Sequence, residues 1–267
     1  MQENIYLVKP SNLVTENSIE EDVEEECYAA YPQLSASKLR ALYLYPPRRA
    51  HRDILKTSFG NKLSFGRLLH MLLLEPQKSE EILICLPPAE ENSNKDIQAA
   101  KRSEAIAQGK IPVSHSTFHS AQKLKEVTLE NKMIQDIINS SRKELTLRWH
   151  DKKDDIYGKA RLDVLAENHI YDVKTAAQGI LPQNFKKSIG RMGYLIQACW
   201  YQRAVFYNTG KWLPVSFIVV DPINRASRVH PLTESDMKTG ESQINNAIKT
   251  WKHCTKNKSW PTHFIYK

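Results

Sequence analysis

The sequence predicts an α/β domain in which helices cover both faces of one β-sheet. Three segments with strand patterns follow one another at residues 144–149, 160–165 and 170–174, and the polar turns between them predict consecutive antiparallel strands. A fourth segment, residues 215–220, is almost entirely apolar, as expected for a strand that is covered on both sides. Helical patterns lie before, between and after these strands.

Size and composition indicate an ordinary globular protein. The chain has 267 residues, and its 41% hydrophobic and 25% charged residues exclude a disordered protein. No apolar run is long enough to span a membrane, and the first residues lack the basic and apolar regions of a signal peptide. The four cysteines are scattered without zinc or iron–sulfur spacing. We therefore expect a cytoplasmic protein with reduced thiols and no membrane partner.

Charge is distributed unevenly along the chain. Seven acidic residues and no lysine or arginine lie between Glu16 and Glu26, although the whole chain has a net charge of +8. The remainder carries a larger basic excess, which favours a polyanionic partner, although solubility could account for part of it. We predict an acidic N-terminal arm over residues 1–30, with a strand-like start at 5–8, and a single domain over 31–267. A solvated, partly disordered arm is the preferred interpretation, and a DNA-mimicking or partner-docking segment is the alternative.

Helix signals begin after the arm. Residues 34–42 predict a helix with Ser35 or Ser37 as its N-cap, and two prolines end it. A basic cluster follows these prolines directly and consists of Arg48, Arg49, His51 and Arg52. Such a cluster can be a solvated corner or a clamp for DNA phosphates, and both interpretations stay open.

A second helix is predicted at residues 63–75. Apolar residues occur nearly all round it, which indicates a buried helix. Gly66 and His70 lie four residues apart on one face, so the glycine permits close approach of another backbone or a ligand beside the imidazole. A histidine in an apolar helix is usually a satisfied core residue. An enclosed imidazole still needs a polar partner, which a carboxylate–metal cluster would supply.

Two helical regions precede the strands. Residues 87–112 are polar and predict an excursion with a short helix, of the kind that can cover or line a site. Residues 116–140 are patterned as one helix. The strand at 144–149 places Glu144 and Thr146 on one face.

The predicted hairpin over residues 160–165 and 170–174 carries two carboxylates and a lysine. Asp172 and Lys174 project from the same face of their strand, and Asp163 on the partner strand can reach the same point. Clustered carboxylates attract a hard divalent cation such as Mg²⁺, and a lysine beside them can orient the attacking water in phosphodiester hydrolysis. Taken alone, the Asp-x-Lys pattern is more often a solvated face or surface ion pair.

The rest of the chain contains a connecting segment at 175–191 and a helix at about 192–207. Gln197 and Tyr201 share a face of this helix. Such a stripe is more often core packing, although these side chains could also hydrogen-bond phosphate or stack on a base. Thr233 is expected to cap the last long helix.

Four motifs occur in an order that resembles the PD-(D/E)xK nuclease superfamily. They are Gly66-Arg-Leu-Leu-His70, Arg161-Leu-Asp163, Asp172-Val-Lys174 and Gln197-x-x-x-Tyr201. The similarity extends over about residues 28–262 and is greatest to the RecB-like branch, in particular to the C-terminal nuclease domain of the exonuclease VIII (RecE) type. One departure is that the family commonly has Arg-Pro-Asp where this chain has Arg161-Leu-Asp163, which leaves the acid in place.

The resemblance implies a restriction-endonuclease-like core with a central mixed sheet. It also implies a Mg²⁺-dependent exonuclease that degrades linear double-stranded DNA, in the 5′ to 3′ direction, and leaves 3′ single-stranded tails for recombination by strand annealing. Mn²⁺ could substitute, with one or two ions per site. The implied partners are DNA ends, other subunits in a ring-shaped trimer or tetramer, and a RecT-like annealing protein.

The resemblance also implies roles for the residues of the four motifs. His70, Asp163 and Asp172 would be metal ligands, with the backbone carbonyl of Val173 as a further ligand, and Lys174 would act on the water. Glu144 would support the ligands. The expected DNA-binding residues are Gln197, Tyr201, Arg161, Arg48, Arg49 and Arg52.

Two other functions compete with the nuclease. A catalytically silent scaffold could bind DNA ends in recombination, although the complete set of His70, Asp163, Asp172 and Lys174 argues against it. Alternatively, Lys174 could form a Schiff base with a carbonyl substrate, but that needs an uncharged lysine, whereas the neighbouring Asp172 favours the charged form.

Overall fold

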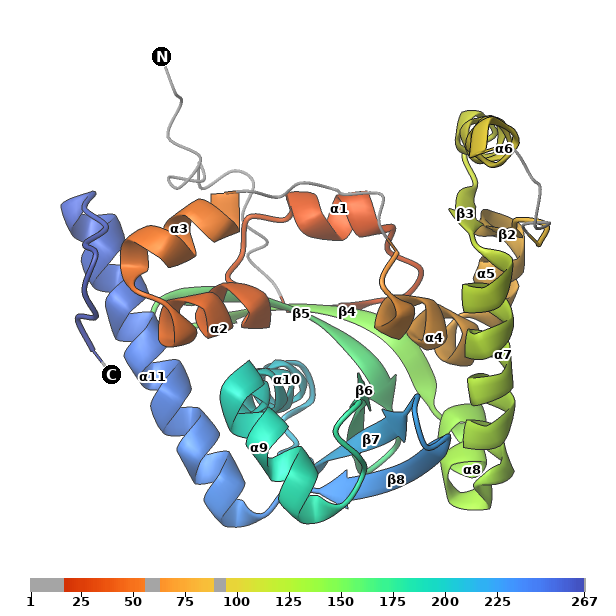
Figure 1. Ribbon diagram of the computed structural model, residues 1–267. Helices are drawn as coiled ribbons and strands as arrows, with labels where there is room; N and C mark the ends of the chain where they lie inside the picture. Colours follow the sequence, from red (N-terminus) through yellow and green to blue (C-terminus); the bar gives the residue numbers. More distant parts are fainter. Residues whose placement is uncertain (1–16, 56–62, 89–94, 267) are drawn as a thin grey trace.

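The computed structural model describes residues 17–55, 63–88 and 95–266 of the chain. Its centre is a six-stranded mixed sheet with the order β1-β4-β5-β6-β7-β8, in which β6 and β7 are parallel and the other neighbours antiparallel (Figure 1). The strands are β1 (Ser18–Glu20), β4 (Arg142–Asp151), β5 (Ile156–Leu165), β6 (Ile170–Thr175), β7 (Val215–Asp221) and β8 (Ala226–Pro231). The predicted fold class, a central mixed sheet flanked by helices, is confirmed.

Helices cover both faces of this sheet (Figure 1). One face packs on α2 (Ala36–Leu44), α9 (Pro182–Met192), α10 (Tyr194–Thr209) and α11 (Glu234–Asn257), and the other on α4 (Phe65–Leu74), α7 (His115–Glu130) and α8 (Lys132–Ser140). The remaining elements are α1 (Glu25–Ala30), α3 (Pro47–Leu55), α5 (Pro76–Ile82), α6 (Lys95–Ala107) and the parallel pair β2 (Leu83–Cys85) and β3 (Ile111–Val113). Every residue of β7 is buried, as its apolar sequence predicts.

Helix starts follow the capping signals of the sequence. The Ser35 hydroxyl accepts a hydrogen bond from the backbone N–H of Lys38, so Ser35 caps α2. Thr233 and Asp236 form a reciprocal capping box at the start of α11. Both cap predictions are confirmed.

The approach of α4 to the sheet depends on Gly66. A Cβ at this position would lie 2.9 Å from Oγ1 of Thr175, the last residue of β6, so a larger residue would displace the Thr175 side chain or the helix. Six apolar residues of α4 are buried, which confirms the prediction of a buried helix. This close packing holds His70 against the strand pair β5–β6.

The acidic arm is the main difference from the expectation. Residues 17–30 are folded: β1 pairs with β4, and the Nε of Arg148 donates to Glu20 at 2.8 Å. Residues 17–30 therefore pack on the domain, and the carboxylates of Glu20, Glu21, Glu24 and Glu25 meet basic partners that are distant in sequence. The strand-like start at residues 5–8 lies outside the described residues.

Three element boundaries also differ. The helix predicted over 116–140 is two helices, because Asn131 ends α7 and its side chain caps α8 by accepting from the N–H of Ile134. The connecting segment at 175–191 contains α9. The second proline, Pro47, opens α3, since proline is favoured in the first turn of a helix, so the basic cluster is helical. No helix in the described part of the chain is both long and apolar enough to cross a bilayer.

Replacing Gly240 with alanine is expected to lower the free energy of unfolding by about 1–3 kcal/mol, the usual cost of overpacking. A Cβ there would lie 2.4 Å from Sγ of Cys199 and 2.7 Å from the backbone oxygen of Leu195, so α10 and α11 would have to separate. Gly190 in α9 is a matched control, because a Cβ there meets nothing within 4 Å. Gly190→Ala should be neutral or stabilising by up to about 1 kcal/mol, and thermal unfolding measures both variants. Equal stability of Gly240→Ala and Gly190→Ala would contradict this packing.

Candidate active site

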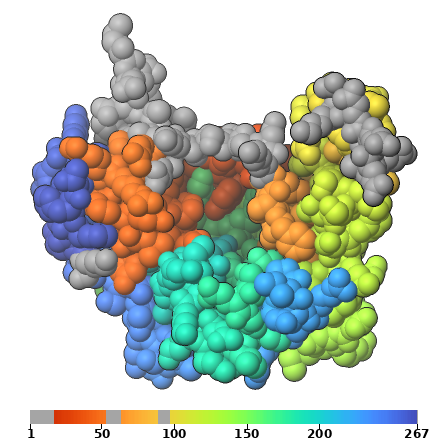
Figure 2. Space-filling model, viewed as in Figure 1, coloured from red at the N-terminus to blue at the C-terminus, as the bar shows by residue number. Residues whose placement is uncertain are grey.

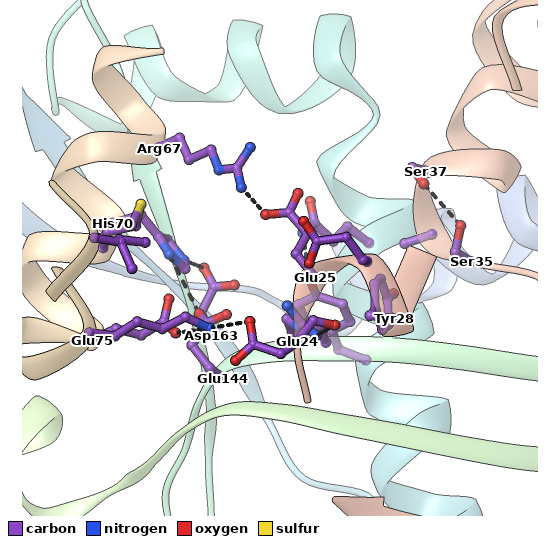
Figure 3. A pocket seen from close by; sticks show the side chains of 18 of the residues that line it. Glu24, Glu25, Tyr28, Ser35, Ser37, Arg67, His70, Glu75, Glu144 and Asp163 are labelled. Atoms are coloured by element: carbon purple, nitrogen blue, oxygen red, sulfur yellow. Dashed lines mark hydrogen bonds and ion pairs between the residues drawn. The ribbon is translucent and has the colours of Figure 1, made fainter. Parts of the chain in front are cut away.

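Three side chains that are far apart in sequence converge on one point. The Nε2 of His70 on α4 lies 2.9 Å from Oδ2 of Asp163 on β5, and its Nδ1 lies 3.5 Å from Oε1 of Glu144 on β4 (Figure 3). One ligand atom from each of the three lies within 4.8 Å of the others, an arrangement that could hold a metal ion. His70 therefore has the polar partner that its apolar helix requires.

Glu144 reaches this point through an unusual backbone. Lys143 pairs with Val164, and Leu145 pairs with Leu162, so Glu144 lies opposite Asp163 in the register of β4 and β5. Its φ is 52°, in the left-handed region that costs a non-glycine residue about 1–3 kcal/mol. Its Oε1 is buried and accepts no hydrogen bond from the described residues. A strained backbone fits a ligand position, and so does a buried oxygen that is held by the 3.5 Å ion pair with His70 but by no hydrogen bond from the described residues.

Asp163 is also tied to β6. Its Oδ2 accepts a hydrogen bond of 2.8 Å from the backbone N–H of Val173, just beyond the last ladder pair, Val164 with Tyr171. The Val173 peptide thus lies beside the cluster. Coordination by its carbonyl stays a prediction.

Asp172 and Lys174 form the next layer of the site. Asp172 is fully buried, its Oδ2 is ion-paired with Nζ of Lys174, and its Oδ1 accepts from Nε2 of Gln197 at 3.0 Å. The same amide nitrogen donates to the hydroxyl of Tyr201 at 2.7 Å. Gln197 and Tyr201 therefore orient the Asp172 carboxylate through a short network, a role that the sequence does not reveal. Contact of these two residues with DNA stays a prediction.

The cluster opens into a cavity of about 420 Å³. Figure 2 shows a hollow between the orange helices α2 and α4, with the green strands at its floor. His70, Glu144 and Asp163 line this cavity together with Gln197 and Tyr201. Its lining also includes residues that were not predicted to belong to the site, namely Ser35, Arg40, Arg67, Lys78 and the acidic side chains of Glu24 and Glu25.

Comparison with known proteins identifies the family of the chain. Residues 50–264 match the family described as a PDDEXK-like domain of unknown function (DUF3799). The chain belongs to this family. The predicted PD-(D/E)xK nuclease domain is thereby confirmed, and the protein is a nuclease enzyme, while a special closeness to the RecE type is not established.

One solved structure has the same fold. A "putative exonuclease" from Eubacterium rectale is 14% identical, with 91% of this chain and 90% of that chain covered and a TM-score of 0.65. A phage-related exonuclease from Haemophilus somnus 129PT is 13% identical, with coverage of 85% and 96% and a TM-score of 0.35, too low to support an argument. No curated protein matches the sequence.

Burial and neighbouring charges shift the pKa values of the titratable groups in the PDDEXK-like site. Burial acts to lower the pKa of His70, but the Asp163 carboxylate outweighs burial and raises that pKa to about 9. Burial raises the pKa of Glu144 to about 8, opposed by His70 and reinforced by the charge of Asp163. Burial likewise raises the pKa of Asp172 to about 7, although Lys174 opposes it. Near neutral pH the metal-free site therefore retains protons that a divalent cation would displace.

The predicted basic residues are only partly near the cavity. Arg161 lines it, with Nη2 donating to the carbonyl of Val23 at 2.5 Å. Arg48 and Arg49 do not: Nε of Arg48 donates to the carbonyl of Trp260 at 3.4 Å, and the guanidinium of Arg49 lies 3.8 Å from the ring centroid of Tyr45. Arg52 belongs to the same helix, α3, and is also absent from the lining. A DNA contact by this cluster, if made, would lie outside the cavity.

In the absence of metal, the free energy of unfolding is expected to fall as the pH rises from 6.5 to 9. His70 has a folded pKa of about 9 and an ordinary value of 6.5, so the folded state binds the extra proton throughout this window and loses that advantage on deprotonation, on the order of 2 kcal/mol. Glu144 acts in the same direction up to about pH 8.

Thermal unfolding in EDTA across this pH range measures the effect, with His70→Gln as the variant in which the slope should be shallower. Added Mg²⁺ should stabilise the wild type more at pH 9 than at pH 6.5, because fewer protons then compete for the ligands. A metal-free stability that rises with pH in this window would contradict the assignment.

Proposed function

We propose that the protein is a Mg²⁺-dependent exonuclease that degrades linear double-stranded DNA from 5′ ends and leaves 3′ single-stranded tails for recombination by strand annealing. The observation that carries the proposal is the convergence of His70, Glu144 and Asp163 in a cavity, with the buried Asp172–Lys174 ion pair near enough to act electrostatically on Asp163. This is the arrangement expected of residues that cleave a phosphodiester with a divalent cation.

The donor set suits a hard cation. Carboxylate oxygens of Asp163, Asp172 and Glu144 and the carbonyl of Val173 are ligands that Mg²⁺ and Mn²⁺ accept, and His70 adds one imidazole nitrogen. One or two such ions would neutralise charge at the scissile phosphate and activate the attacking water. For this, His70 must give up the proton that it shares with Asp163.

Lys174 and Gln197 act on the same carboxylate from two sides. Gln197 fixes Oδ1 of Asp172, and Lys174 pairs with Oδ2, so Asp172 is held in one orientation. In the proposed reaction the Lys174 ammonium orients the attacking water or balances charge that develops on the phosphate. A Schiff-base role fits less well, because the Lys174 side chain is only 12% exposed and its nitrogen is already paired.

The assembly and the partner are further parts of the proposal and rest on the resemblance alone. A ring-shaped trimer or tetramer would enclose one DNA end, and a RecT-like protein would receive the single-stranded product. Sedimentation analysis of the purified protein tests the subunit number.

Linear duplex DNA labelled at either the 5′ or the 3′ end tests the activity. The expected result is early release of the 5′ label in Mg²⁺, none in EDTA, and no cleavage of closed circular duplex of the same sequence. Duplex binding without any cleavage across Mg²⁺ and Mn²⁺ would overturn the proposal in favour of the silent scaffold. Early release of the 3′ label would reject only the polarity.

A further inference from the structure

Two cations at the rim of the cavity are occupied by the protein's own carboxylates. Arg67 on α4 forms an ion pair with Glu25 (Figure 3). Nζ of Lys78 on α5 lies 3.3 Å from Oε2 of Glu24. Lys78 also lies 3.7 Å from Oε1 of Glu75. All of these residues line the same cavity as His70 and Asp163.

These cations are placed where a DNA backbone would pass. Arg67 precedes His70 by three residues on α4, so the two side chains lie on neighbouring parts of one helix face. A phosphodiester at the His70–Asp163 cluster would bring its adjacent phosphates to the rim, because phosphates repeat along a DNA strand at a spacing of a few ångströms. Carboxylates at that rim would repel the strand unless they moved.

The acidic side chains can move without unfolding their segment. Helix α1 has no buried residue, yet its backbone is held at both ends: Arg161 donates to the carbonyl of Val23, and Nζ of Lys159 donates to those of Tyr28 and Tyr31, each at 2.6 Å. The Glu24 and Glu25 side chains are 63% and 47% exposed. Rotation of these two side chains would therefore release Arg67 from Glu25 and would leave Lys78 with its longer pair to Glu75.

We propose that Arg67 and Lys78 are phosphate-binding residues for DNA, and that Glu24 and Glu25 occupy them in the free protein and compete with the DNA backbone. The inference rests on the proposed function, since it assumes that a nucleic acid enters this cavity. It assigns a substrate-binding role to Arg67 and Lys78. It also assigns to Glu24 and Glu25 the places that DNA phosphates would take, although their composition alone predicts a solvent-exposed segment.

The double variant Glu24→Gln/Glu25→Gln tests the competition. Its affinity for a fluorescent linear duplex in EDTA, measured by anisotropy, should increase by roughly two- to thirtyfold, because an exposed ion pair contributes little individually. The plot of log affinity against log salt should steepen by about 1 to 2, since each freed cation releases counterions on binding. Glu21→Gln is the matched control: Glu21 belongs to the same segment, pairs with Arg142 at 2.9 Å, and does not line the cavity.

Arg67→Ala tests the cation itself. It should weaken duplex binding and reduce the salt slope by about 1, whereas Arg142→Ala, which breaks the control pair, should change neither. The loss caused by Arg67→Ala should be larger in the Glu24→Gln/Glu25→Gln background, where the arginine has no internal partner.

The outcomes separate the two proposals. Wild-type protein that neither binds nor cleaves duplex DNA would refute the nuclease function and, with it, this inference. Wild-type cleavage with unchanged or weaker binding in Glu24→Gln/Glu25→Gln would reject the competition alone. Unchanged binding in Arg67→Ala would reject the phosphate-binding role.

Discussion

Replacing Asp163 with asparagine is expected to slow duplex cleavage by about 10²–10³-fold, the range for loss of one preorganised electrostatic contact with the transition state. Asp163 lies 2.9 Å from His70 and accepts a hydrogen bond from Val173, so it connects α4, β5 and β6 at the proposed ligand point. Asparagine keeps the shape of the side chain and an acceptor for the N–H of Val173. It removes the negative charge that would attract a metal cation and that stabilises protonated His70.

A second measurement separates this effect from misfolding. The Asp163 carboxylate is the main cause of the raised His70 pKa of about 9, so in Asp163→Asn that pKa should return toward the ordinary value of 6.5. Histidine titration by NMR in EDTA detects the shift without any turnover. Asp136→Asn is a suitable control, because the Asp136 side chain is 64% exposed on α8 and its carboxylate pairs with Lys132, away from the cavity lining. Full cleavage activity in a folded Asp163→Asn protein would remove Asp163 from the site.

The hairpin could be predicted from sequence because its signals are local. Alternation places Asp172 and Lys174 on one face, and a short loop limits the register that brings Asp163 to them. The structure has this pairing, with Val164 opposite Tyr171. Capping residues such as Ser35 and Thr233 were also predictable, since a cap acts on backbone groups within three residues.

The acidic segment could not be predicted because its partners are distant. Glu20 meets Arg148, and Glu25 meets Arg67, pairs that no local pattern connects. A run of acids without basic neighbours looks solvated unless the fold brings cations to it. Arg67 itself lies three residues before the histidine that was predicted as a ligand, so its proximity to the site could have been recognised from helical spacing.

The backbone conformation at Glu144 could not be predicted for a different reason. Alternation predicts an ordinary strand residue, whereas its φ is 52° and the ladder is interrupted there. Such strain persists only where surrounding packing imposes it, and here the flanking pairs of β4 with β5 do so. No propensity rule identifies the position, although its acidic side chain opposite Asp163 indicates why it is tolerated.

Replacing Lys174 with methionine is expected to reduce cleavage by about 10²–10⁴-fold, the range typical for a positioned group that takes part in proton transfer. Methionine has a similar length and no charge, so the packing beside Tyr194 is largely kept, while the Asp172 carboxylate loses its cation. Lys186→Met on the exposed side of α9 is the matched control and should leave cleavage unchanged.

The stability of Lys174→Met should depend on pH in a defined direction. Asp172 is fully buried and its pKa is already raised to about 7, and loss of Lys174 raises it further. A carboxyl group whose folded pKa lies above its unfolded value stabilises the folded state at low pH and loses that contribution as the pH rises through the folded pKa. In EDTA the variant should therefore lose little stability at pH 5 and about 3 kcal/mol or more at pH 8, as when one partner of a buried ion pair is removed.

The double variant Lys174→Met/Asp172→Asn distinguishes charge pairing from catalysis. An asparagine at 172 carries no charge that needs a partner, so stability at pH 8 should recover while cleavage stays lost. Recovery of both stability and cleavage in the double variant would mean that Lys174 serves only to neutralise the charge of Asp172. Failure of either single variant to slow cleavage would mean that the buried pair supports the fold, and that hydrolysis depends on the His70, Glu144 and Asp163 cluster alone.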